Sequence, residues 1–395
     1  MYLLSSQKQI HLQQQAQAMI DTIILTLSSS AYRITDPDAF GLSPRTIGGT
    51  VRKTRDMAST YNPTQKELRA GIYKPRLTLM PRITFDGSWD TLLKIELSLP
   101  KLLFGNNFDE LNNKDFSALV DALACSLSGM GVVVTKEALA QAPVNGIHYA
   151  KNIPLTDGST PYHFITKIKD ANIKLSLDVN QTDYRNDGHC YKWHCNTYEV
   201  VFYDKIRDLE QAKKSSKRAV EKESALQLNL LDTLKQRKKL EILRMEVRLN
   251  KRAKIAQLFE QLGIRAKLTF AGLFKTSIAK KVLLYYLDEL ERMRTPLLDY
   301  AAKSDKILLA SLIVHNPELS ARKIMQLYGF KKAMEIATPR ELRTMFTKSA
   351  GRSWHRIMAE AKDVRLPLAQ NSLGHFMTMR KKIAQFKPVR LELFF

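Results

Sequence analysis

Tyr203 and Lys205 lie two residues apart in the segment NTYEVVFYDKIRDLE, residues 196–210, and suggest nucleophilic chemistry. In an extended chain successive side chains point to opposite faces, so Glu199, Tyr203 and Lys205 share one face. Tyr198, Val200 and Phe202 form the other face and can pack in a core. A tyrosine with an ordinary pKa near 10 needs a cation or metal ion beside it to attack as phenolate. This face therefore predicts phosphoryl transfer through a tyrosine.

Three other segments alternate in the same way, with apolar side chains on one face and chemically active groups on the other. They are LLKIELSLPKLLFGNN (92–107) with Glu96, GIHYAKNIPL (146–155) with His148 and Lys151, and LRMEVRLNKR (243–252) with Arg244, Glu246 and Arg248. If the four segments share one sheet, its polar face collects carboxylates, an imidazole and cations. Oxygen and imidazole groups suit a divalent metal ion, and arginine and lysine suit a phosphodiester.

The charge of the chain points to a polyanionic partner. Its 395 residues hold 62 Lys and Arg against 39 Asp and Glu, a net charge of +23. A basic excess of that size favours nucleic acid over a membrane surface, because no apolar run is long enough to span a bilayer and no secretory signal opens the sequence. The three cysteines are too few for a disulfide framework, which predicts a reducing cytoplasm.

The pattern along the chain predicts an α+β fold with a mainly antiparallel sheet. We expect a helical and loop region over 1–70, a sheet domain over 71–260 and a helical domain over 261–395. Residues 209–243 lack Pro and Gly and are rich in strong helix formers, so they are expected to form a basic helical insert between strands. The segment around YGF, within 317–346, is a candidate helix-turn-helix.

The four alternating segments, in this order, resemble segments of the rolling-circle replication initiators of filamentous phages, the gene-II type, and of the related plasmid Rep-trans initiators. The resemblance covers about residues 70–260 and rests on LLKIELSLPKLLFGNNF, GIHYAKNI, VVFYDKIRDLE and LRMEVRLNKRAKI. It implies a metal-dependent endonuclease that nicks one strand of an origin and becomes joined to the 5′-phosphate through a tyrosine.

The resemblance also implies roles for single residues. Tyr203 is the expected nucleophile, with Tyr191 and Tyr198 as alternatives, and Lys205, Arg244 and Arg248 would manage the phosphate charge. Glu246, His148 and Glu199 would hold Mg²⁺ or Mn²⁺, although His148 stands where the phage proteins carry an acid. The basic insert would contact DNA phosphates through Lys213, Lys214, Lys217 and Arg218.

The expected partners are an origin DNA, single-stranded or supercoiled, and a host helicase and polymerase in the cytoplasm of a bacterial cell. A homodimer is compatible with the sequence, and no membrane partner is expected. Two alternatives from other classes stay open, a DNA-binding regulator without catalysis and an RNA-binding module. A regulator has no reason to bring Tyr203, Glu246 and His148 together, so their convergence would discriminate between regulator and enzyme.

Overall fold

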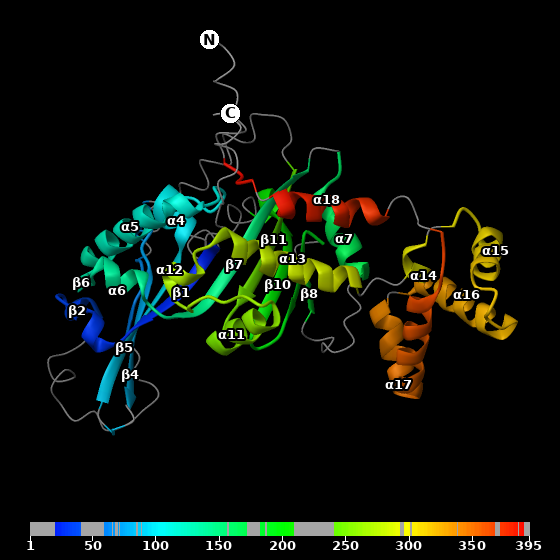
Figure 1. Ribbon diagram of the computed structural model, residues 1–395, viewed down its shortest axis with the longest axis horizontal. Coiled ribbons are helices and arrows are strands. Elements are labelled where there is room, and N and C mark those ends of the chain that lie inside the picture. Colours follow the sequence, from blue (N-terminus) through cyan, green and yellow to red (C-terminus); the bar gives the residue numbers. More distant parts are fainter. Residues whose placement is uncertain are drawn as a thin grey trace, which may run out of the picture.

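The computed structural model describes residues 20–40, 59–155, 158–171, 182–208, 241–292 and 296–390, apart from short gaps within these ranges. Helices and one large sheet build the chain (Figure 1). Residues 209–240 of the basic insert, with Lys213, Lys214, Lys217 and Arg218, lie outside the described residues, whereas 241–243 belong to a strand and not to a helix.

Nine strands form the large sheet, in the order β3-β4-β5-β1-β7-β11-β10-β9-β8, and every neighbouring pair in it is antiparallel. This confirms the predicted α+β architecture with an antiparallel sheet. The strands are β1 (Ile20–Leu27), β3 (Ser59–Tyr61), β4 (Arg76–Ile83), β5 (Trp89–Ser98), β7 (Val144–Leu155), β8 (Thr182–Arg185), β9 (Cys190–His194), β10 (Tyr198–Asp204) and β11 (Glu241–Leu249). A separate small ribbon pairs β2 (Arg33–Ile34) with β6 (Val132–Val133).

One α-helix directly follows β5, several pack on the sheet, and most of the chain after β11 is helical, as the sequence predicts. The α-helices are α4 (Leu99–Phe104), α5 (Phe116–Ser128), α6 (Lys136–Ala140), α7 (Pro161–Ala171), α11 (Arg252–Gln261), α12 (Phe270–Leu273), α13 (Thr276–Arg292), α14 (Pro296–Asp299), α15 (Asp305–His315), α16 (Ala321–Ile336), α17 (Pro339–Asp363) and α18 (Ser372–Gln385). Three single-turn 3₁₀ helices are η2 (Ser29–Ala31), η3 (Asp38–Phe40) and η4 (Asn113–Asp115).

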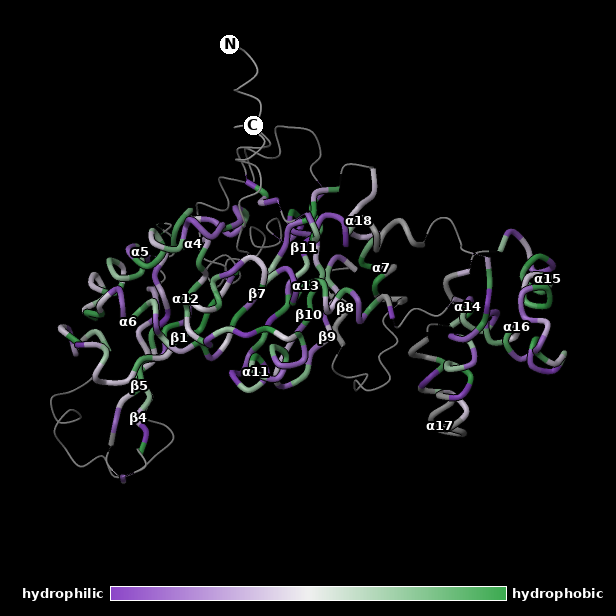
Figure 2. The backbone as a smooth tube through the Cα atoms, in the orientation of Figure 1, coloured by the Kyte–Doolittle hydropathy of each residue, from purple (hydrophilic) through white to green (hydrophobic). Residues whose placement is uncertain are grey.

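The two faces of the sheet differ because polar and apolar residues alternate along its strands (Figure 2). On one face Ile95, Met245 and Phe202 are buried in the main core. Helix α13 covers this face, since Tyr286 of α13 packs on Tyr198 with ring centroids 5.4 Å apart. The opposite face carries the polar side chains that the sequence predicts to share one surface.

Strand β1 corrects the expectation that the N-terminal region is helix and loop. It lies in the middle of the sheet, between β5 and β7, although both of these strands come much later in the chain. Its sequence IDTIILTL contains five β-branched residues, which favours a strand. The sheet therefore takes a central strand from outside the predicted 71–260 range.

The C-terminal helices form two groups. Helices α14 to α17 enclose a second core that includes Leu312, Leu327 and Trp354, while α18 returns to pack against α13 and β7 (Figure 1). The proposed turn at YGF is wrong, because Gly329 lies inside α16. The sequence FITKIKDANIKLSLDV (164–179) predicts β or mixed structure, but its described part, 164–171, belongs to α7. Among the described residues no helix is both long and apolar enough to cross a membrane.

Candidate active site

A cavity of about 470 Å³ opens on the polar face of the sheet and receives side chains from strands that are far apart in sequence. Among the predicted site residues Tyr203, Glu246, His148 and Arg248 line it. Glu96, which the sequence places on the same face, lines it too. Residues that sequence reasoning did not select complete the wall, namely Asp21, Thr22, Tyr73, Arg76, Leu97, Ser98, Lys101, Asn107, Cys190, Val201 and Asp208.

The register of three strands explains why these groups meet. Strand β11 pairs with β10 so that Tyr203 lies opposite Arg244, and it pairs with β7 so that Arg248 lies opposite His148. Side chains at such cross-strand positions share a face and lie within contact distance. If either pairing shifted by one residue, the polar side chains of one strand would point to the helix-covered face and not to the cavity.

Glu246 is a buried carboxylate that an arginine holds at the cavity. Its side chain is 3% exposed, and Arg248 donates to it from Nε at 3.0 Å. Burial opposes ionisation of Glu246, but the charges of Arg248, Arg244 and His148 prevail and hold its pKa at about 2. Glu246 is therefore a carboxylate at neutral pH.

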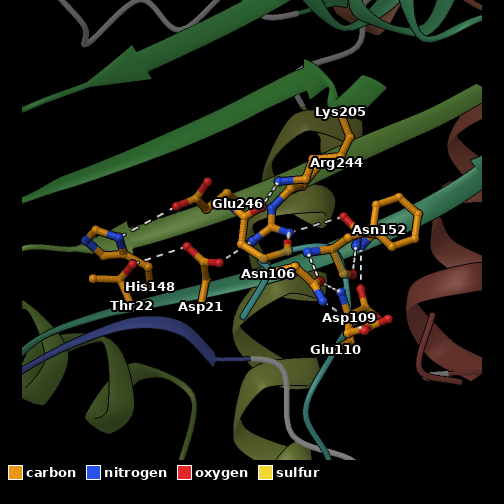
Figure 3. A network of polar contacts seen from close by, with 12 residues as sticks. Asp21, Thr22, Asn106, Asp109, Glu110, His148, Asn152, Lys205, Arg244 and Glu246 are labelled. Carbon is orange, nitrogen blue, oxygen red and sulfur yellow. Dashed lines mark hydrogen bonds and ion pairs between the residues drawn. The ribbon is translucent and has the colours of Figure 1, made fainter. Parts of the chain in front are cut away.

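His148 faces Glu246 from the neighbouring strand (Figure 3). Its Nδ1 lies 3.6 Å from Oε1 of Glu246, and its side chain is 17% exposed. Burial lowers the pKa of the imidazole, and Arg248 adds to this, although Glu246 opposes both. A lowered pKa favours the neutral imidazole, which is the form that binds a metal ion.

His148 and Glu246 can serve as two ligands of a divalent ion whose other ligands are water molecules and substrate oxygens. Within the described ranges no three His, Cys, Asp or Glu side chains gather as a metal-binding group. Mg²⁺ often binds only one or two protein carboxylates and completes its shell with water and phosphate oxygens, whereas imidazole is more usual as a ligand of Zn²⁺, Cu²⁺, iron or Ni²⁺. Glu199 does not join this pair, because it does not line the cavity; its carboxylate binds Arg248 at 3.2 Å and Lys192 at 3.7 Å.

Tyr203 is a protonated phenol in the protein by itself. Burial raises its pKa well above the ordinary value, and the charge of Arg244 only partly opposes this. Lys205 does not supply a full compensating charge, because its own burial lowers its pKa to about 7. Its Nζ donates to Oδ1 of Asn107 at 2.8 Å and lies 6.0 Å from the centroid of the Tyr203 ring. Without a metal ion, the surroundings of Tyr203 thus favour the neutral phenol.

Arg244 holds the framework of the site and does not line the cavity. Its side chain is 3% exposed and binds Asp21 at 2.7 Å, and it also donates to Asn152 and to the carbonyl of Asn107 (Figure 3). The sequence reading placed Arg244 on the substrate phosphate, whereas the structure directs it to protein groups.

Asp21 reaches the cavity because β1 contains an irregularity. Ile20 pairs with Tyr149 and Thr22 pairs with His148, so Asp21 is an extra residue against β7. Such a bulge lets two consecutive side chains, here Asp21 and Thr22, reach the same cavity. The signal that could have found this strand is the β-branched run that surrounds Asp21.

Both alternative nucleophiles lie on the helix-covered face. Tyr191 is fully buried and its ring lies 5.8 Å from that of Trp193. Tyr198 packs against Tyr286, and burial raises the pKa of its phenol to about 12. Of the three tyrosines considered, Tyr203 alone lines the cavity.

The segment HCYKWHC forms β9 and the residues beside it, as a strand that leads to β10. Its His and Cys side chains, which are residue types that can bind zinc, contact different partners. His189 lies 3.3 Å from Asp204, Cys195 contacts Thr197, and Cys190 lines the cavity.

A buried ion pair supports the loop that carries Asn107. Glu110 accepts from Nζ of Lys151 at 2.6 Å and from the backbone N–H groups of Asn152 and Val389 at 2.6 and 2.8 Å. Both side chains are almost fully buried, at 6% and 2% exposure. Lys151 lies opposite Met245 and so on the helix-covered face, which corrects the expectation that it shares a face with His148. Its Nζ also donates to the carbonyl of Lys387 and so ties the C-terminal residues to this loop.

We expect Glu110→Ala to lower the free energy of unfolding by about 3–5 kcal/mol, since Lys151 would stay buried without its carboxylate. Asp121→Ala is the matched control, because Asp121 pairs with Lys136 at 2.6 Å with both side chains more than half exposed. That change should cost less than about 1 kcal/mol. Urea denaturation of both variants measures the difference, and equal losses would show that the buried pair adds nothing specific.

Comparisons with known proteins find no matching family profile, no matching curated protein and no matching solved structure.

Proposed function

We propose that the chain is a site-specific, metal-dependent DNA endonuclease that nicks one strand through a tyrosine and so starts rolling-circle replication. The observation that supports this proposal is the convergence of Tyr203, Glu246 and His148 on one cavity. The resemblance of four strand segments to the phage and plasmid initiators also supports it, and the net charge of +23 suits a DNA substrate.

The chemistry is a transesterification at one phosphodiester. The Tyr203 oxygen attacks the phosphorus as its proton leaves, and the bond from phosphorus to the 3′-oxygen breaks. The 3′-oxygen takes up a proton and becomes a free 3′-hydroxyl, while the 5′-phosphate stays on the tyrosine. The number of phosphoester bonds is unchanged, so religation needs no nucleotide.

The surrounding residues divide the remaining work. Arg248 is one-third exposed and lines the cavity, so it can bind a phosphate oxygen while it orients Glu246. Lys205, with a pKa of about 7, can lose or gain a proton near neutral pH beside the Tyr203 ring. Arg244 fixes Asp21 and the loop of Asn107.

Glu246 and His148 would hold a divalent ion, Mg²⁺ or Mn²⁺. When bound, the ion supplies positive charge for the phosphate oxygens in the transition state. The high pKa of Tyr203 makes such a charge necessary, because the phenol must become an oxyanion as it attacks.

The competing function is a DNA-binding regulator that lacks catalysis. Such a regulator would bind DNA through its basic surface, but DNA binding alone does not require a phenol, an imidazole and a buried carboxylate to lie together. Perturbed ionisable groups in a cleft are typical of catalytic sites.

A supercoiled plasmid library tests the proposed function. The full chain is incubated with the library and Mg²⁺ or Mn²⁺, nicked circles are sequenced, and the peptide joined to DNA is mapped by mass spectrometry. Metal-dependent nicking at a recurrent site with DNA attached to the peptide of Tyr203 is the expected result. Binding with neither a nick nor an adduct in either metal would favour the regulator.

A further inference from the structure

Residues 387–390, which follow α18, contact the loop that carries Asn107, far away in the sequence. Helix α18 brings them to the sheet, because Met379 and Ile383 are buried in the main core and the helix packs against α13 and β7. Pro388 disfavours a helical backbone at the residue before it, so the helix does not continue into this segment. The backbone groups of 387–390 are therefore free to bond outside a helix.

The segment is attached to Glu110 and to the partner of Glu110, Lys151. The N–H of Val389 donates to the Glu110 carboxylate at 2.8 Å, and the N–H of Glu110 donates to the carbonyl of Val389 at 3.1 Å. The carbonyl of Lys387 accepts from Nζ of Lys151 at 2.6 Å. Val389, Glu110 and Lys151 are all buried, so water competes poorly for these hydrogen bonds.

Arg390 contacts both ends of the same loop. Its Nη2 donates to the Asp115 carboxylate at 3.3 Å, and its guanidinium carbon lies 4.3 Å from the centroid of the Phe104 ring. Phe104 ends α4 and Asp115 ends η4, so these two contacts flank Glu110 in the sequence. The segment therefore holds the loop at its start, in its middle and at its end.

Asn107 connects this loop to the candidate active site. Its side-chain oxygen accepts from Nζ of Lys205 at 2.8 Å, and its carbonyl accepts from Arg244 at 3.0 Å. Asn107 lies three positions before Glu110, and both belong to one polar network with Asn152 (Figure 3), whose N–H binds Glu110 while its side chain binds Arg244. A displacement of Glu110 would therefore disturb the bond between Asn107 and Lys205.

We propose that Val389 and Arg390 are positioning residues, which hold Asn107 against Lys205 and so complete the site of the proposed nicking step. This inference rests on the proposed function for the reaction, and it adds the requirement that the segment after α18 be docked on the loop. Neither residue lines the cavity, so both act through the loop. Asn107 lines the cavity, whereas Lys205 is fully buried and does not, so Asn107 shields the amine of Lys205.

Val389→Pro tests this role, because it removes the N–H that binds Glu110 and keeps the residue apolar. The full-length variant is treated with acetic anhydride, and acetylation of Lys205 is followed by mass spectrometry, which requires neither DNA nor a nick. Lys205 should react at least about tenfold faster than in the unmodified protein, because opening of the loop removes its protection. Asn107→Ala, which removes the shield directly, is the positive control. Val389→Ile keeps the N–H and should retain the protection.

Arg390→Gln is a second variant, which keeps every backbone bond and loses the contacts with Asp115 and Phe104. It should accelerate the reaction of Lys205 by about two- to fivefold, since Arg390 is partly exposed. Lys387→Gln is the matched control, because the side chain of Lys387 is exposed and only its carbonyl makes the contact.

Thermal unfolding of each variant checks that it folds. Equal acetylation of Lys205 in Val389→Pro and in Lys387→Gln would overturn the positioning role. If Val389→Pro does not fold, the comparison of Arg390→Gln with Lys387→Gln decides in the same way.

The rate of adduct formation separates this inference from the proposed function. In Val389→Pro the rate should fall by between about tenfold and 100-fold, because small displacements within a catalytic site have effects of that size. If the unmodified protein forms the adduct and Val389→Pro forms it equally fast, the positioning role is wrong and the nickase stands. If the unmodified protein forms no adduct but Val389→Pro exposes Lys205 as expected, the segment does position Asn107 and the nickase is wrong.

Discussion

Replacement of Tyr203 by Phe should abolish the covalent DNA adduct and lower nicking at least about 10⁴-fold, to the limit of detection. The ring remains, so its packing and the neighbouring Lys205 keep their positions, and only the attacking oxygen is lost. Binding to DNA should change less than about threefold, because phosphate contacts come from other side chains. Gel analysis of the adduct and a binding titration on the same nicked sequence measure the two effects.

Tyr198→Phe is the control from the same strand. Tyr198 points to the helix-covered face and packs against Tyr286, so it should retain nicking. An adduct that survives in Tyr203→Phe and disappears in Tyr198→Phe would show that the nucleophile has been assigned to the wrong face of the sheet.

Glu246→Gln should reduce metal-dependent nicking by at least about 100-fold, and excess Mg²⁺ or Mn²⁺ should not restore it. The amide keeps the shape of the side chain but loses the charge that the metal ion and Arg248 both need. Nicking rates over a metal titration provide the measurement. A variant that regains full activity at high metal would remain bound to metal through other groups, and Glu246 would not be the ligand.

The same substitution should lower the free energy of unfolding by about 2 kcal/mol at neutral pH. This is less than the loss expected for a fully buried pair, because Arg248 keeps Glu199 at 3.2 Å and is one-third exposed. The folded pKa of Glu246 is about 2, below its ordinary value of 4.5, so its contribution is present above pH 4.5 and lost as the pH falls toward 2. The difference between the two proteins should therefore shrink over that range.

The Glu246→Gln and Glu110→Ala variants test different parts of the site. Glu246 faces the cavity with Arg248 and His148, while Glu110 fixes the loop that presents Asn107 to Lys205 and Arg244. A large catalytic defect in Glu246→Gln with the smaller loss of stability, and a larger loss of stability with a smaller catalytic defect in Glu110→Ala, would separate the chemistry from its support.

Local pattern was sufficient to predict several strands and their faces. The alternation in LRMEVRL and EVVFY requires one face to be buried, and the structure places Met245 and Phe202 in the core and Tyr203 at the cavity. The helical C-terminal region follows from its composition in the same way. These features depend on neighbours within a few residues, which is why the sequence alone determines them.

Only the tertiary structure decided which of the polar groups meet and what each one contacts. Asp21 enters the cavity because a bulge and a long-range pairing insert β1 between β5 and β7, and no local pattern specifies that partner. Arg244 and Arg248 alternate identically in sequence, yet Arg244 binds Asp21 while Arg248 reaches the cavity. Burial also sets the ionisation of Tyr203 and Lys205, since the free energy of a charge depends on the groups that surround it in space.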